Sequence, residues 1–238
     1  MTYRLYQQDC LEWMRQQPDD SIDIILTSPP YNFDKPYNSY KDDISDYRSW
    51  LNAWIAEGVR ILEPTGRFII NIQPRFTHNE PYHYWVHSAM ERVGMIWYGE
   101  RIWEKNAISG YRGAAGSMGI PSKPFLWYST EYVQIFSKTA THRPTPKADS
   151  LITIADQVSY ARHHIWPIAP ARQKDHPAQM PLSLADRILR LFGRRGDLVY
   201  DPFAGAGTTL LAAKNLGLDS IGTEIDPKYC QLIHERLR

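Results

Sequence analysis

The sequence predicts an α/β protein whose sheet is doubly wound and mostly parallel, with a Rossmann-like order of elements and an irregular basic insertion. Strand-like apolar runs alternate with segments whose apolar residues recur at helical spacing. The run at 22–26 is almost continuously apolar, which is typical of a parallel strand covered on both faces. Between 104 and 174 the alternation breaks, and Gly, Ser, Pro and basic residues become frequent. We therefore expect one domain over 1–238 with 104–174 inserted into it.

The individual elements follow from the same patterns. In the first half we expect strands at 3–7, 22–26 and 67–72 and helices at 11–17, 47–62 and 82–93. Pro64-Thr65-Gly66 should end the helix at 47–62, and Trp50, Trp54 and Trp85 should lie in the core because they fall on apolar helix faces. Further along we expect strands at 94–103, 131–138, 197–200 and 220–223, helices at 182–192, 208–215 and 227–237, and loops elsewhere in the insertion.

The composition is that of an ordinary globular protein, with 43% apolar and 22% charged residues. No apolar run approaches the roughly 20 residues that cross a bilayer, and the first residues lack the features of a signal peptide, so we expect no membrane association and a cytoplasmic location. Cys10 and Cys230 are too few for a disulfide framework or a Cys-rich zinc site. Because the histidines also lack partners at metal-ligand spacing, no metal is expected.

The net charge of +1 conceals an uneven distribution. Residues 1–100 carry 9 Lys and Arg against 14 Asp and Glu, whereas residues 101–174 carry 10 against 4. A basic middle third suits a surface that binds a polyanion, although a solvated basic loop region would give the same count.

A rigid stretch, Ser28-Pro29-Pro30-Tyr31, follows the strand at 22–26. An ordinary turn would use Gly, Asn or Asp with one Pro at most. Two prolines fix two φ angles and remove two N–H donors, whereas their carbonyl oxygens remain acceptors. The stretch therefore indicates a stiff row of acceptors beside an aromatic ring.

A glycine turn, Asp201 to Gly207, follows the strand at 197–200, and Thr208 begins the next helix. Glycines there let the backbone approach a ligand closely and leave helix N–H groups free. No Lys-Ser/Thr follows, which excludes a P-loop, and Thr209 stands where the dinucleotide fingerprint has its last Gly or Ala. A purely structural turn remains the alternative.

A carboxylate follows at the end of the next strand, where Glu224 comes about 20 residues after the glycines and can accept both ribose hydroxyls of a nucleoside. Asp226 is better placed to cap the helix at 227–237, which leaves Glu224 available. The sequence thus predicts a nucleoside pocket without a phosphate-gripping Lys. Asp9 has two interpretations, a cofactor contact or a cap for the helix that begins near Leu11.

Together these residues resemble the amino-group DNA methyltransferases, which use S-adenosylmethionine. "SPPY" matches their catalytic motif, "DPFAGAGTT" their cofactor loop and "GTEIDPKYC" their acidic strand, while "DHPAQMPLSLADRIL" and "QQDCLEWM" are similar to two flanking segments. Since the catalytic motif precedes the cofactor loop, with target recognition between them, the order resembles the permuted β class. The resemblance covers nearly the whole chain except about 104–165, and Met180 stands where relatives often have an aromatic residue or Lys.

The resemblance implies roles for individual residues. Ser28 Oγ and the Pro29 carbonyl would accept the N–H bonds of an exocyclic amine, and Tyr31 would stack on a base flipped out of the duplex, with Pro30 adding stiffness. S-adenosylmethionine, which leaves as S-adenosylhomocysteine, would contact Asp9, Cys10, Asp201, Pro202, Phe203, Ala204, Gly205, Gly207, Thr208, Thr209, Glu224 and Ile225. The loop cations Arg112, Lys123, Arg143 and Arg162 are the candidates for DNA contacts.

The target base is predicted to be cytosine, methylated at N4, because Ser rather than Asp precedes Pro-Pro-Tyr and "HPAQMP" resembles a segment of cytosine N4 enzymes. Asn32 favours the alternative, adenine N6. Neither cysteine lies in a Pro-Cys setting, which counts against methylation at carbon 5.

Double-stranded DNA is the expected partner, and we expect the protein to be associated with the nucleoid. A cognate restriction endonuclease and a homodimer are compatible with this interpretation. RNA or protein-glutamine methylation and a catalytically silent nucleic-acid-binding module are the competing functions. A zinc deaminase is excluded because it needs a His-x-Glu together with a Pro-Cys-x-x-Cys, and no Pro-Cys-x-x-Cys is present. His176 is expected to be structural.

Overall fold

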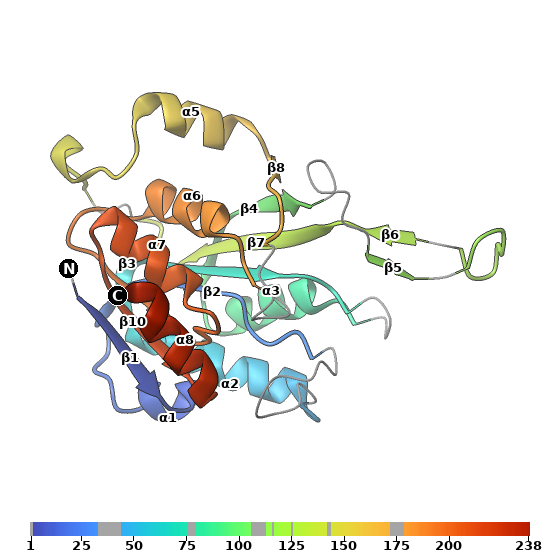
Figure 1. Cartoon of the computed structure of the whole chain (residues 1–238), viewed down its shortest axis with the longest axis horizontal. Helices are drawn as coiled ribbons and strands as arrows, with labels where there is room; N and C mark the ends of the chain where they lie inside the picture. Colours follow the sequence, from blue (N-terminus) through green and yellow to red (C-terminus); the bar gives the residue numbers. More distant parts are fainter. Residues whose placement is uncertain are drawn as a thin grey trace.

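An eight-stranded sheet forms the centre of the molecule, in the order β1-β10-β9-β2-β3-β7-β4-β8 (Figure 1). The computed structural model describes residues 2–32, 44–75, 80–105, 113–115, 117–124, 126–141, 144–171 and 179–238. The strands of this sheet are β1 (Tyr3–Gln7), β2 (Ile22–Thr27), β3 (Leu62–Ile72), β4 (Ile96–Glu104), β7 (Thr130–Ser137), β8 (Ile165–Pro167), β9 (Leu198–Asp201) and β10 (Asp219–Glu224). A separate two-stranded hairpin joins β5 (Gly113–Ala115) to β6 (Leu126–Tyr128).

The strand directions place the carboxyl ends of β2, β9 and β10, which lead into the predicted motifs, at one edge of the sheet. Pairing is parallel from β1 through β10, β9 and β2 to β3, whereas β7 runs antiparallel to both β3 and β4. It follows that β2, β3, β4, β9 and β10 all end at the same edge, the carboxyl edge. In open α/β sheets this edge is where ligands bind, so the mostly parallel fold predicted from the sequence already directs attention to it.

Helices cover both faces of the sheet. They are α1 (Cys10–Met14), α2 (Tyr47–Ile61), α3 (Tyr82–Arg92), α5 (Ile154–Arg162), α6 (Leu182–Phe192), α7 (Thr208–Leu216) and α8 (Pro227–Leu237), with a 3₁₀ turn at Lys147–Asp149. Residues of α1, α2 and α3, such as Trp54, pack with Ile25 on one face, and residues of α6 and α7 pack with Ile24 and Leu26 on the other. Because successive strand residues point to opposite faces, this continuous apolar run is what a doubly covered strand requires.

The predicted core tryptophans lie on the α2–α3 face. Trp54 is fully buried, and Trp50 and Trp85 are partly buried against the same cluster. No helix in the described part of the chain is long and apolar enough to span a membrane.

The end of α2 differs from the prediction. The helix ends at Ile61 and β3 begins at Leu62, so Pro64-Thr65-Gly66 belongs to a strand instead of forming a helix stop. The β2–β3 pairing shifts register between Ile22 and Ile24, and irregularities of this kind are where strands accept Pro and Gly. A Cβ on Gly66 would lie 2.7 Å from the Asp23 carbonyl oxygen, which explains the glycine.

The insertion is more regular than the prediction of loops. It contains the β5–β6 hairpin, helix α5 and strand β8, and β8 pairs with the last residues of β4, Ile102 to Glu104. These elements have three to nine residues, and α5 is capped by Thr153, which accepts a hydrogen bond from Asp156 N. Segments this short leave too little periodicity for the sequence to reveal them.

Candidate active site

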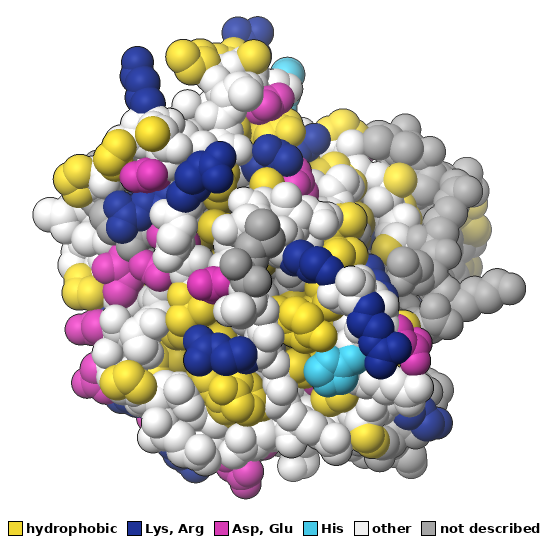
Figure 2. All heavy atoms as spheres, turned by 60° about the vertical axis from the view of Figure 1, so that its left-hand side comes forward, with side chains coloured by type: hydrophobic (Ala, Val, Ile, Leu, Met, Phe, Trp, Pro, Cys, Tyr) yellow, Lys and Arg dark blue, Asp and Glu magenta, His cyan; other side chains and the backbone are white. Residues whose placement is uncertain are grey.

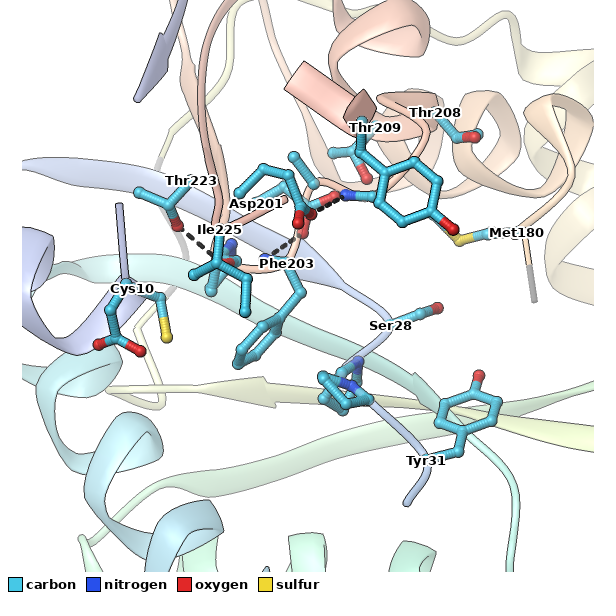
Figure 3. A pocket seen from close by; sticks show the side chains of 18 of the residues that line it. Cys10, Ser28, Tyr31, Met180, Asp201, Phe203, Thr208, Thr209, Thr223 and Ile225 are labelled. Carbon is cyan, nitrogen blue, oxygen red and sulfur yellow. Dashed lines mark hydrogen bonds between the residues drawn. The ribbon is translucent and has the colours of Figure 1, made fainter. Parts of the chain in front are cut away.

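A pocket at the carboxyl edge gathers the two predicted motifs. Its lining combines the stretch after β2, the turn after β9, the end of β10 and the start of α1 (Figure 3). Figure 3 shows Cys10 and Ile225 at one end, Ser28 and Tyr31 at the other, and Phe203 between them. The segments that carry the two motifs lie more than 170 residues apart in the sequence, and the parallel order β10-β9-β2 brings them together.

The turn after β9 is fixed by Asp201. Its Oδ1 accepts hydrogen bonds from Thr27 Oγ1 at 2.6 Å and from the Phe203 backbone N–H at 3.1 Å. This carboxylate therefore ties the end of β2 to the end of β9, where the two motifs begin. Burial raises the pKa of Asp201 to about 6, although the hydrogen bonds from Thr27, Thr209 and Phe203 oppose that shift.

Glu224 ends β10 and is held by two backbone donors. Gly205 N–H donates to Oε2 at 2.8 Å, and Asp226 N–H donates to Oε1 at 2.9 Å. A carboxylate accepts about four hydrogen bonds, so each oxygen keeps a free position while the side chain is held in one orientation. Desolvation raises the pKa of Glu224, and the two backbone bonds counter it. As predicted, Asp226 caps α8 by accepting from Lys228 N–H at 2.8 Å.

The first helix adds the third wall of the pocket. Asp9 caps α1, its Oδ1 accepting from Leu11 N–H at 2.8 Å and from Glu12 N–H at 3.2 Å, which is one of the two interpretations of this residue. Both Asp9 and Cys10 also line the pocket. Burial raises the pKa of the Cys10 thiol far above its usual range, so Cys10 is a neutral apolar wall and not a nucleophile.

The stretch from Ser28 to Tyr31, called the catalytic stretch after its predicted role, rests on a buried polar network that the sequence did not reveal. Asn71, in β3, donates from Nδ2 to Ser28 Oγ at 3.1 Å and also to Glu131 Oε2. The hydroxyl of Tyr31 donates to Glu131 Oε2 at 2.8 Å. Glu131 is the second residue of β7, and it is 4% exposed. The network therefore fixes both Ser28 and Tyr31 through a carboxylate that does not itself line the pocket.

Lys105 compensates the buried charge of Glu131. Its ammonium group pairs with Glu131 Oε1, donates to Gln73 Oε1 at 3.1 Å and lies 4.8 Å from the centre of the Trp103 ring. Both charged side chains are almost fully buried, and burying either one unpaired would be costly.

Asn32 has an architectural role next to the catalytic stretch. It adopts a left-handed backbone conformation (φ 54°), which Asn tolerates better than most residues. Its side chain holds both backbone groups of Ile44, accepting from Ile44 N–H at 2.7 Å and donating to the Ile44 carbonyl at 3.2 Å. Ile44 in turn lines the pocket, so Asn32 positions one of its walls.

The chemistry of the pocket fits the cofactor that the resemblance implies. Among the described residues that line it there is no Lys, Arg or His, whereas three carboxylates, Asp9, Asp201 and Glu224, are present. Such a lining is poorly suited to phosphates but suits a nucleoside that carries positive charge. Cys10, Phe203, Ile225 and Tyr229 supply the apolar surface that an adenine ring would need.

Most of the predicted site residues meet in this pocket. Ser28, Pro29, Pro30 and Tyr31 line it, together with Asp9, Cys10, Asp201, Pro202, Phe203, Ala204, Gly205, Thr208, Thr209, Glu224 and Ile225. Gly207 does not, because it faces α8, where an added Cβ would lie 2.8 Å from Ile233 Cγ1. Its positive φ of 75° gives a second structural reason for glycine at that position. Met180 is buried and lines the pocket beside Gln179.

Two of the predicted DNA contacts can be placed. Lys123 is exposed at the tip of the β5–β6 hairpin, and Arg162 is exposed at the end of α5. Arg112 and Arg143, like His176, lie outside the described residues. Figure 2 shows Lys and Arg side chains standing beside Asp and Glu side chains among the residues drawn in colour, so charge alone does not identify a DNA-binding face there. Within the described ranges, no three His, Cys, Asp or Glu side chains are grouped to hold a metal.

Comparison with known proteins places this architecture. The chain is 30% identical to the type II methyltransferase M.BamHI of Bacillus amyloliquefaciens over 260 residues, which cover 99% of the chain but 57% of the relative. It is 25% identical to the type II methyltransferase M.ScaI of Streptomyces caespitosus, covering 98% of the chain and 80% of that relative. The chain therefore spans little more than half the length of M.BamHI.

Solved structures agree on the fold. TTHA0409 of Thermus thermophilus, a provisionally assigned DNA modification methylase solved in complex with S-adenosyl-L-methionine, matches with a TM-score of 0.75 at 28% identity, over 99% of this chain and 95% of that one. The cytosine-N4-specific PvuII DNA methyltransferase matches with a TM-score of 0.77 at 21% identity, over 100% of this chain and 87% of that one. The family model N6_N4_Mtase, described as DNA methylase, matches residues 22–235, from the strand before Ser28 to the last helix. The chain belongs to the N6_N4_Mtase family of DNA methylases.

Proposed function

We propose that this protein transfers a methyl group from S-adenosylmethionine to the N4 amine of a cytosine flipped out of double-stranded DNA. One observation carries the proposal: the same pocket is lined by the acceptors of Ser28-Pro29-Pro30 and by Glu224. The membership of the family and the type II methyltransferases among the relatives support it. TTHA0409 supports the choice of cofactor, because its structure contains S-adenosyl-L-methionine.

The cofactor half would bind the nucleoside of S-adenosylmethionine. The free positions of the two Glu224 oxygens would accept the ribose hydroxyls, while Cys10, Phe203 and Ile225 enclose the base. Gly205 lets the backbone approach, because a φ of 50° there is open to glycine. Asp201 would hold the turn in place through Thr27 and Phe203, and the other predicted contacts of the turn and of α7 would complete the site.

The catalytic half would activate the amine. S-adenosylmethionine, when bound, supplies an electrophilic methyl group. The lone pair of an exocyclic amine is delocalised into the ring, so acceptors on its N–H bonds favour a localised lone pair and stabilise the positive charge that develops on nitrogen. Ser28 Oγ accepts one hydrogen bond from Asn71 and keeps a second acceptor position for the amine. The Pro29 carbonyl is an acceptor on a residue that has no N–H donor.

Tyr31 would hold the flipped base by its ring. The Tyr31 side chain lines the pocket, but its hydroxyl points into the buried network with Glu131 and Asn71. The ring face and the hydroxyl would thus have separate roles, stacking and positioning.

Adenine N6 is the alternative target. Asn32 is the sequence feature that favours adenine, and its clamp on Ile44 supplies a reason for this residue that does not depend on the target base. With that feature explained, Ser28 in the first position of the catalytic motif leaves cytosine as the better supported target.

The decisive experiment is nucleoside mass spectrometry of plasmid DNA from a methylation-deficient host after incubation with the purified protein and S-adenosylmethionine. We expect N4-methylcytosine. N6-methyladenine would establish the alternative, and methylation of RNA but not DNA would contradict the proposal. The Ser28→Ala variant should lose about 100-fold in the single-turnover rate while keeping its DNA affinity, the pattern of a group that acts on developing charge.

The remaining expectations are proposals of the same kind. The order of motifs supports the permuted β class, with 1–238 acting as one methyltransferase domain and 104–174 as its target-recognition region. Arg112, Lys123, Arg143 and Arg162 would contact DNA there. A paired restriction endonuclease, a homodimer and association with the nucleoid complete the proposal.

A further inference from the structure

We propose that the β5–β6 hairpin enters a groove of duplex DNA and that Met118 and Ile120, at its tip, wedge into the base stack beside the target base. The inference rests on the proposed function and adds to it a specific element and a mode of contact. Figure 1 shows the hairpin extending away from the sheet beyond β4 and β7, farther than any other labelled element on that side.

The hairpin leaves the molecule at the edge that carries the active site. It lies between β4 and β7 in the chain, and β4 ends at the same carboxyl edge as β2, which leads into Ser28. Only Ser129 separates β6 from β7, so the hairpin continues the ribbon that β4 and β7 form in the sheet. A two-stranded ribbon is one of the few elements that fit the major groove of B-DNA.

The tip combines apolar side chains with solvent exposure. Met118 is 76% exposed, Ile120 47% and Leu126 50%, and every residue from Ser117 to Lys123 is exposed. Scattered apolar residues are common on surfaces, but these three gather on one projecting arm. Met, Ile and Pro are among the side chains that architectural proteins insert between base steps, and the tip also carries Pro121 and Pro124.

The tip is stiff, as a wedge must be. Ser117 N–H donates to the Lys123 carbonyl at 2.9 Å, and Lys123 N–H donates to the Ile120 carbonyl at 3.1 Å. Gly119 adopts a φ of 70° between the two apolar residues, which allows the tight turn. An apolar tip that is already ordered loses little conformational entropy when it inserts into a partner.

The base of the hairpin is anchored in the active site. Lys105 N–H donates to the Ser129 carbonyl at 2.8 Å, and the Lys105 side chain pairs with Glu131, which accepts the hydroxyl of Tyr31. The Lys105–Glu131 ion pair is therefore shared by two parts of the proposed mechanism. One is Tyr31, which would stack on the flipped base, and the other is the hairpin, which would fill the place of that base in the duplex.

Charge points to DNA as the occupant. The sequence from 106 to 130 contains Arg112 and Lys123 and no Asp or Glu. Lys123 lies at the tip itself, where it would meet phosphates on either side of the groove. An apolar protein surface would give no reason for basic residues without acidic ones in this segment, so the charge favours DNA.

The test compares Met118→Ala/Ile120→Ala with Ile96→Ala/Trp97→Ala, a control that removes two exposed apolar side chains (43% and 54%) from the start of β4, outside 104–174. Both are assayed in single turnover on two duplexes that carry the site mapped on plasmid DNA. In one duplex the target base is paired, and in the other it faces an abasic position, so that its extrusion costs less. The hairpin variant should lose about tenfold or more on the paired duplex and at most about threefold on the abasic one, and the control should resemble the wild type on both.

Equal losses on both duplexes would show that the tip is an ordinary contact surface, and full activity on the paired duplex would exclude any role; either result overturns the proposal. Anisotropy with fluorescein-labelled random-sequence duplexes separates this outcome from failure of the proposed reaction. If the wild type transfers no methyl group, the proposed reaction fails, and binding to such duplexes with and without one abasic position then decides the hairpin proposal. It stands if the hairpin variant binds only the fully paired duplex more weakly than the wild type does, and it fails if the two proteins bind both duplexes alike.

Discussion

The two halves of the pocket are built by different means. In the half proposed to bind the cofactor, called the cofactor half, Asp201, Gly205 and Glu224 lie within one stretch of the chain. Backbone N–H groups hold both carboxylates, and Thr27 is the one distant side chain that adds a hydrogen bond among those described. In the catalytic half, Ser28 and Tyr31 are held by side chains from other strands, Asn71 at a separation of 43 residues and Glu131 at 100. Backbone donors are present whatever the sequence, whereas a network of side chains depends on every member.

This difference predicts unequal tolerance to substitution. In the cofactor half, the loss of Glu224 leaves the Gly205 N–H at the pocket, where water can reach it. In the catalytic half, the loss of Glu131 removes the carboxylate that pairs with Lys105 and an acceptor that Tyr31 and Asn71 share. The largest effects should therefore come from a residue that does not line the pocket.

Glu131→Ala should be the most damaging single change. Breaking a buried ion pair from one side costs roughly 3–5 kcal/mol, because the remaining charge has no compensation. Urea unfolding should show a loss of that size. Glu57→Ala, which breaks the partly exposed pair with Arg60 in α2, is the matched control and should cost less than about 1 kcal/mol.

A loss for Glu131→Ala no larger than the control would show that the catalytic half is as tolerant as the cofactor half. Lys105→Met combined with Glu131→Gln removes both charges at once. The double variant should have a higher free energy of unfolding than Glu131→Ala, because a buried ion pair can often be replaced by neutral side chains.

Asp201→Asn tests the charge of the cofactor half. The pKa of about 6 in the folded protein lies above the ordinary value of 3.8, so the folded state binds more protons between those pH values. The favourable contribution is complete below about pH 4 and is lost as the pH rises through 6. The amide that replaces the carboxyl group does not titrate, so the variant should lack this part of the pH dependence, worth about 3 kcal/mol. Unfolding free energies measured from pH 4 to pH 7 check it, and identical curves for both proteins would contradict the assigned cause.

The same contrast explains how far the sequence could be interpreted. The cofactor half was predictable because its turn, its glycines and Glu224 are close in sequence. The alternation of strands and helices, which indicates a parallel sheet, was also visible from local periodicity. Asn71 was missed because it is one polar residue in the apolar run "FIINI", and Glu131 because "TEYVQIF" mixes polar and apolar residues without marking any of them. A lone Asn within a buried run was the available signal, but its partner cannot be known before the strand order β3-β7-β4 is known.

Helix α5 and strand β8 were missed for a related reason. Strand β8 has three residues and gains its place from pairing with Ile102 to Glu104, which is a tertiary property. Trp166 at its centre is buried and donates from Nε1 to the Tyr160 carbonyl at 3.0 Å. Packing of this kind determines secondary structure where propensity and periodicity are weak.

Glu224→Ala should weaken cofactor binding by about 1.5–3 kcal/mol, the value of hydrogen bonds to a charged group. The backbone N–H groups of Gly205 and Asp226 would lose an acceptor; Gly205 lines the pocket, where water can replace the carboxylate, whereas Asp226 is buried. Calorimetry with S-adenosylmethionine measures the effect. Asp219→Asn, at the exposed start of the same strand, is the control and should bind as the wild type does. Wild-type affinity for Glu224→Ala would remove this residue from the cofactor site.

Tyr31→Phe should have the smallest effect and separates the two proposed roles of this residue. The ring that would stack on the base remains, whereas the hydrogen bonds of the hydroxyl to Glu131 Oε2 and to Asn71 are lost. Glu131 keeps Asn71 and Lys105 as donors, so no charge is left unpaired, and the free energy of unfolding should fall by about 1–1.5 kcal/mol. Single-turnover methylation should stay within about tenfold of the wild type, whereas Tyr31→Ala should lose a further 1–3 kcal/mol or so, roughly the value of the stacking surface. If Tyr31→Phe is as inactive as Tyr31→Ala, the reaction requires the Tyr31 hydroxyl and its hydrogen bonds. The catalytic half would then depend on Asn71 and Glu131 for activity as well as for stability.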